Sequence, residues 1–69
     1  MSDYGTPIME AVERVYHKPA AVLHYLLFER VQNAGARLPN GMPEQMEAVA
    51  VAVIEGWSAA NPEKRVFGE

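Results

Sequence analysis

The 69-residue sequence predicts an all-α fold, in which a short N-terminal helix is followed by a helical hairpin. Prolines fall at positions where helices can begin or end, and apolar residues between them recur every three or four positions, as on the buried face of a helix. Nothing in the composition indicates disorder, because 49% of the residues are hydrophobic. We expect one domain, with helices at about 7–16, 19–34 and 43–60 and a frayed tail at 61–69.

The first expected helix begins at a strong start signal. Thr6 is a suitable N-cap residue, and Pro7 fits the first helical position, where no backbone N–H is needed. Apolar side chains then recur at helical spacing through Tyr16. Pro19 disfavours helical backbone at Lys18, so we expect a break or sharp bend there.

The second expected helix, 19–34, is apolar on nearly every side. After Pro19, eight of the next nine residues are apolar, and the exception is His24. Gly35 can supply the left-handed position that ends such a helix. A tight turn at 39–41, Pro-Asn-Gly, then leads into the third helix.

The third segment contains an ambiguity, because residues 48–54 alternate alanine and valine in a strand-like pattern. Both faces of such a strand would be apolar, and alanine disfavours strands. Over 43–60 a helix explains the pattern better and predicts one apolar face: Met46, Val49, Ala50, Val53, Trp57 and Ala60. Gly56 lowers helix propensity and can mark a close approach of another backbone.

Composition excludes several classes of protein. The chain has no cysteine, which excludes disulfides and thiolate metal sites and fits a reducing cytoplasm. Its formal net charge of −3 argues against nucleic acid as a partner, since phosphate binding needs clustered cations. The start lacks the features of a signal peptide, and the longest uncharged apolar run is too short to span a membrane. We therefore expect a cytoplasmic protein without a membrane partner.

No catalytic or metal-binding motif is present. His17 and His24 are separated by a proline break, so they do not share a helix face as metal ligands would. His24 is expected to be hydrogen-bonded at a core edge or a dimer seam. Pairs of acidic residues are expected on solvent-exposed helix faces, where they are better explained as solvated charges than as catalytic acids. We expect no enzyme activity and no cofactor.

The apolar surplus of the second helix is the main functional signal. Three short helices cannot bury both of its faces, so we predict that a second copy covers one of them in an antiparallel homodimer. The expected dimer or partner interface consists of Val22, Tyr25, Leu26, Phe28 and Trp57. An acidic face at Glu44, Glu47 and Glu55 suits a basic patch on a partner, with ordinary solubility as the alternative interpretation.

Two stretches, "PAAVLHYLLFERVQNAG" and "PEQMEAVAVAVIEGW", form an acidic, cysteine-free helical hairpin. In length, charge sign and helix count the chain resembles small phage-encoded inhibitors of host proteins, the anti-activators of quorum-sensing transcription factors in Pseudomonas. No residue motif is shared, so no functional residue is carried over. The resemblance implies a dimeric protein that binds and inhibits or modulates a larger host protein, such as a transcription regulator. The alternatives are a small dimeric DNA-binding regulator and a subunit or assembly factor of a larger complex.

Overall fold

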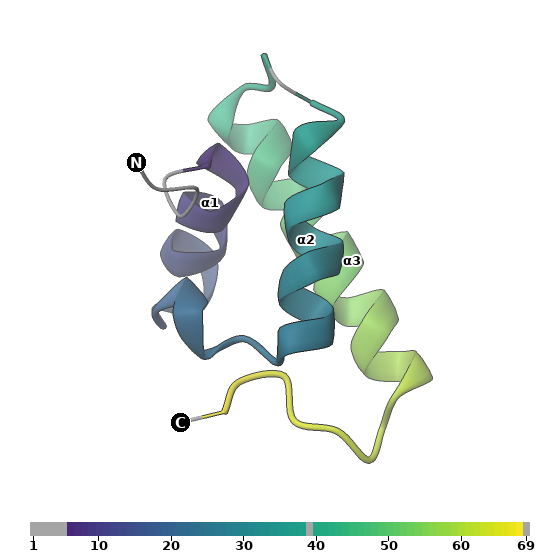
Figure 1. The fold of residues 1–69 in the computed structure, drawn as a ribbon. Coiled ribbons are helices and arrows are strands. Elements are labelled where there is room, and N and C mark those ends of the chain that lie inside the picture. The colour runs from purple at the N-terminus through teal and green to yellow at the C-terminus, as the bar shows by residue number, and fades with distance from the viewer. Residues whose placement is uncertain (1–5, 39, 69) are drawn as a thin grey trace.

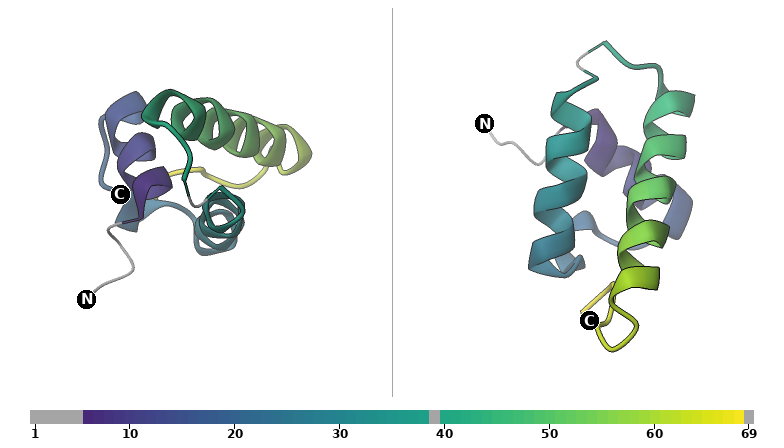
Figure 2. Two further views of the ribbon diagram at one scale, coloured as in Figure 1. Left: turned by 90° about the horizontal axis from the view of Figure 1, so that it is seen from above. Right: turned by 90° about the vertical axis from the view of Figure 1, so that its right-hand side faces the viewer.

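The computed structural model describes residues 6–38 and 40–68, and within them it is all-α, as predicted. Helices α2 and α3 run side by side in opposite directions and form the hairpin (Figure 2). Helix α1 packs against both of them, most extensively against α3 (Figure 1). The elements are α1 (Pro7–Tyr16), the 3₁₀ turn η2 (Ala20–Val22), α2 (Tyr25–Ala36) and α3 (Pro43–Ala60).

Helix α1 has the predicted bounds, but its start differs from the expected cap. Thr6 has extended backbone and Pro7 follows it, yet the Thr6 hydroxyl makes no capping hydrogen bond. Its Oγ1 atom is buried without a partner among the described residues. The carbonyl oxygen of Thr6 instead accepts bonds from the N–H groups of Met9 and Glu10. The start of α1 is therefore stabilised by the backbone carbonyl of Thr6 and by Pro7, and not by the Thr6 side chain.

The predicted helix at 19–34 is wrong in its first six residues. His17 takes the left-handed conformation, with φ 57° and ψ 38°, and closes α1 by donating its N–H to Glu13. After Pro19 the chain forms only the short turn η2, and α2 begins at Tyr25. The Glu13 carboxylate accepts a bond from the backbone N–H of Ala20 at 2.8 Å. In a helix that began at Pro19, the N–H of Ala20 would be in the first turn and would have no partner within the helix. The Glu13 carboxylate supplies that partner.

Gly35 was predicted to end the second helix in a left-handed conformation. This prediction is wrong, because Gly35 lies inside α2. No glycine in the described part of the chain has a positive φ. A Cβ atom added at Gly35 would overlap the Ile8 side chain, lying 2.8 Å from its Cβ atom. Glycine at this position lets α1 and α2 approach closely.

The core lies between the three helices and continues under the η2 turn. Helix α2 turns only Leu27 and Val31 fully inward, one helical turn apart. Each such residue contributes about 1.5–3 kcal/mol through burial. The buried set is Ile8, Met9, Ala11, Val12, Ala20, Leu23, Leu27, Val31, Met46, Ala50, Ile54 and Trp57.

The C-terminal tail, predicted to be frayed, returns to the body of the protein. Leu23 and Phe67 form an antiparallel bridge. His24 donates its backbone N–H to Val66 at 2.8 Å, and Gly68 donates to Val22 at 2.7 Å. The Phe67 ring lies 5.5 Å from that of Tyr16. The tail thus covers apolar surface that the helices leave open (Figure 1).

Helix α3 has the predicted bounds, and residues 48–54 are helical rather than extended. Its fully buried face differs in part from the prediction, since Ile54 is buried and Ala60 is exposed. Val49 and Val53 are half-buried against the core. Gly56 has no atom within 4 Å of an added Cβ, so no backbone of this chain approaches it closely.

Two glycine substitutions are expected to have opposite effects on stability. Gly35→Ala should lower the free energy of unfolding by about 1–2 kcal/mol, because the new methyl group collides with Ile8. Gly56→Ala should raise it by about 0.5–1 kcal/mol, because it adds helix propensity in open space. Urea denaturation followed by circular dichroism measures both. Equal effects of the two substitutions would contradict the close approach of α1 and α2.

The docked tail gives a second expected result. Phe67→Ala should lower the free energy of unfolding by about 2 kcal/mol, less than for a fully buried phenylalanine because this ring is half-buried. Glu63→Gln is the matched tail control and should leave stability unchanged, since Glu63 pairs only with neighbouring Lys64. Thermal denaturation by differential scanning fluorimetry compares the two. A frayed tail would instead make both substitutions silent.

Candidate functional site

The five predicted interface residues do not form one surface. Tyr25 is 75% exposed and Leu26 is 39% exposed, whereas Val22 and Phe28 are half-buried. Trp57 belongs to the chain's own core, with only 6% of its surface exposed. It is buried because α3 turns it inward together with Ile54, so little of its surface is open to a partner, and its place in an interface stays a prediction.

The exposure of Tyr25 follows from the register of α2. Leu27 and Val31 set the inward face, and Tyr25 lies on the opposite side of the helix. Beside it is a shallow depression of about 240 Å³, lined by Ala21, Leu23, Tyr25 and Phe28. We call exposed Tyr25 and Leu26 the apolar patch.

His24 lies at the edge of the core and caps α2. Its Nδ1 atom accepts a hydrogen bond from the backbone N–H of Leu26 at 3.2 Å. Its ring stacks on Tyr25 with centroids 4.9 Å apart and lies 5.0 Å from the Trp57 ring. These contacts account for a polar side chain inside an apolar run, and they connect the patch to the core.

The three glutamates of the predicted acidic face have different surroundings. Glu47 accepts a hydrogen bond from Arg14 Nε at 2.8 Å, in an ion pair between α3 and α1. This pair replaces the helical Glu10–Arg14 pair that sequence spacing allows. Burial raises the pKa of Tyr16 above its ordinary value, and the Glu55 carboxylate raises it further. Glu44 is exposed in the first turn of α3.

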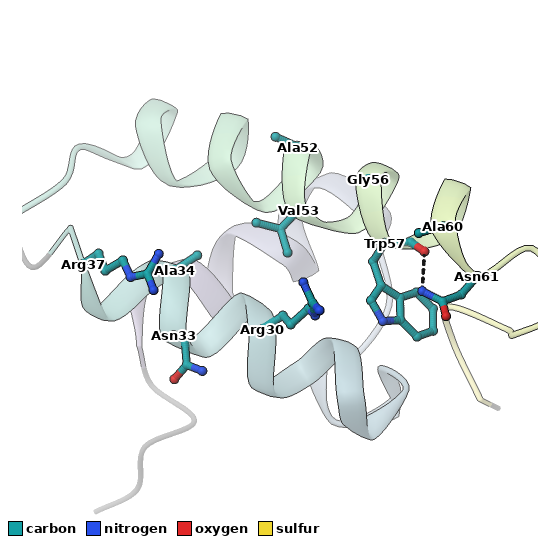
Figure 3. Close-up of a pocket in the computed structure, with 10 residues that line it drawn as sticks. All are labelled: Arg30, Asn33, Ala34, Arg37, Ala52, Val53, Gly56, Trp57, Ala60 and Asn61. Carbon is teal, nitrogen blue, oxygen red and sulfur yellow. Dashed lines mark hydrogen bonds between the residues drawn. The ribbon is translucent and has the colours of Figure 1, made fainter.

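A groove between α2 and α3 has a volume of about 530 Å³ (Figure 3). One wall is polar and comes from α2, and the other consists mainly of small side chains of α3. Sequence reasoning missed this groove. It is lined by Arg30, Asn33, Ala34 and Arg37 of α2 with Ala52, Val53, Gly56, Trp57 and Ala60 of α3, and by Asn61 after it.

The polar wall follows one stripe of α2. Leu26, Arg30, Asn33 and Arg37 are spaced at four, three and four residues, so they lie along one side of the helix. Leu26 of the apolar patch therefore continues the wall by one turn. Within the described residues, the guanidinium groups of Arg30 and Arg37 have no ion-pair partner. Arg30 points toward α3, and Arg37 lies along α2 at the opposite end of the groove from Trp57 (Figure 3).

The geometry offers binding surfaces. Among residues 6–38 and 40–68, no three histidine or acidic side chains come together as metal ligands would. No helix in these ranges is both long and apolar enough to cross a membrane. No family model matches the chain, and no curated protein or solved structure shows significant similarity to it. Functional inference therefore depends on the patch and the groove.

Proposed function

We propose that this chain is a small protein-binding module that self-associates and binds a larger protein to inhibit or modulate it. The observation that supports this proposal best is the groove between α2 and α3, whose Arg30 and Arg37 have no ion-pair partner within the described residues. Exposed Tyr25 and Leu26 at the start of α2 add a separate apolar surface. Aromatic residues and arginine are enriched where proteins bind one another. The proposal includes no catalytic role.

Self-association is proposed to occur through the apolar patch as an antiparallel homodimer. The docked tail already covers Leu23, so the apolar surplus is smaller than the sequence alone indicates. Tyr25 and Leu26 remain the large apolar side chains exposed on α2. A two-fold contact would bury each Tyr25 against a second copy, because such contacts pair the same surface on both subunits.

The larger partner is proposed to be a transcription regulator of a host cell. Two features support this choice: the resemblance to phage anti-activators in length, charge sign and helix count, and a net charge of −3 that suits a basic protein surface. Glu44 is the glutamate of the predicted acidic face that is most available to such a surface, since Glu47 is paired with Arg14. Modulation would follow from occupying that surface.

DNA binding is the second candidate, because Arg30, Asn33 and Arg37 share one exposed helix stripe. That stripe faces the groove with α3, and the chain as a whole is acidic, so a protein partner is favoured. A role as a subunit of a larger complex would use the same surfaces without inhibition.

Leu26→Glu is expected to shift the protein from dimer to monomer, because it places a charge in the apolar contact. Gln45→Glu adds the same charge on α3 and should leave the dimer intact, since its side chain keeps the bond from the Met42 N–H. Sedimentation velocity gives the oligomeric state, and circular dichroism shows that each variant is folded. A folded Leu26→Glu dimer would remove this residue from the seam.

Binding to a larger protein is tested by affinity capture of the full chain from the organism that encodes it, followed by mass spectrometry. We expect one protein in stoichiometric amount, retained after nuclease treatment and at moderate salt. Recovery that depends on nucleic acid, and that falls steeply with salt, would favour the DNA-binding candidate instead. Capture of many subunits in fixed ratio would favour the assembly role.

A further inference from the structure

The α3 wall of the groove allows another helix to approach closely. Ala52, Gly56 and Ala60 are four residues apart, so they form a line that rises about 12 Å along the helix. An added Cβ at Gly56 meets nothing within 4 Å, which leaves the backbone of α3 open to contact there. This length corresponds to about two turns of a helix.

The α2 wall carries positive charge at matching spacing. Arg30 and Arg37 are seven residues apart, which places them about 10 Å apart along the helix axis. Neither guanidinium is paired within the described residues, and both side chains are exposed. Leu26 precedes Arg30 by one turn on the same stripe of α2 and lies beyond the residues that line the groove.

We propose that this groove binds an amphipathic helix of the partner protein, with acidic residues seven positions apart. The small face of that helix packs on Ala52, Gly56 and Ala60, and its carboxylates accept charge-assisted hydrogen bonds from Arg30 and Arg37. The inference rests on the proposed protein-binding function and identifies the kind of segment that the partner presents.

Other occupants match the groove less well. On α3 a second copy offers no two carboxylates seven positions apart, since Glu44, Glu47 and Glu55 are spaced at three and eight residues and Glu47 is bound to Arg14. Nucleic acid would meet two arginines on a chain of net charge −3. A partner helix matches both walls of the groove, since its small side chains can pack on α3 while its carboxylates pair with the arginines of α2.

The test is a selection from a displayed library of two- to four-turn helical peptides against the full-length chain. We expect the wild-type chain to enrich peptides with Asp or Glu seven positions apart beside small residues. The double variant Arg30→Glu/Arg37→Glu should fail to enrich them. Enrichment without acidic bias, or the same peptides on both proteins, would overturn the proposal.

Fluorescence anisotropy with one enriched peptide then gives the size of the effect. Arg30→Gln/Arg37→Gln should raise its Kd by about tenfold or more, since both charge-assisted contacts are lost. Arg14→Gln removes an arginine of α1 that pairs with Glu47 and does not line the groove, so it should leave Kd unchanged. Equal Kd values for all three proteins would argue against the groove.

Two further outcomes separate this inference from the function on which it rests. If the captured cellular complex survives Arg30→Gln/Arg37→Gln without loss, the partner uses another surface and only the groove proposal fails. If those substitutions convert a dimer to monomer in sedimentation, or if duplex DNA displaces the peptide, the groove holds a second copy or nucleic acid instead. Absence of any cellular complex would overturn the proposed function itself.

Discussion

Two backbone hydrogen bonds between the tail and the break before α2 hold the arrangement together. His24 N–H donates to Val66, and Gly68 N–H donates to Val22. Left-handed backbone at His17 ends α1, and Pro19 keeps Lys18 out of helical backbone, so the chain changes direction after α1. Extended backbone at Leu23 can bond to the tail, whereas helical backbone would use the same groups internally. The break therefore both redirects the chain and creates the site where the tail binds.

The break also decides what α2 presents to solvent. Because the helix begins at Tyr25, His24 is free to cap it and to place its ring between Tyr25 and Trp57. The inward positions of α2 are then Leu27 and Val31, and the stripe from Leu26 to Arg37 flanks α3. Leu26 of the apolar patch consequently shares one stripe of α2 with the polar wall of the groove.

Local signals were sufficient to predict α1 and α3. Each begins with proline at its first position, and each has apolar residues at helical spacing, so local propensity and packing agree. The start of α2 was not predictable in this way. Ala20, Leu23, Leu27 and Val31 keep helical spacing across the break, and histidine is an uncommon cap. Only the distant tail, which pairs with Leu23, distinguishes the extended form.

The candidate site was predicted in part for a similar reason. Tyr25 and Leu26 were identified from their surplus of apolar surface, and both are exposed. Trp57 was expected both on the apolar face of the third helix and in the interface, because sequence cannot show how much of a large side chain the interior covers; its side chain is 6% exposed. The spacing of Arg30, Asn33 and Arg37 was visible in the sequence, but their groove exists only once α3 lies beside them. The need for glycine at position 35 likewise could not be predicted, because it arises from close contact with Ile8, which is far away in the sequence.

The position of Trp57 has a practical consequence for spectroscopy. It is the sole tryptophan of the chain, it is buried beside the His24 imidazole, and its edge lines the groove. Its ultraviolet emission therefore reports on two events without any attached dye. Unfolding moves the indole into water and shifts the emission to longer wavelength. A molecule entering the groove beside Asn61 changes the surroundings of the indole directly.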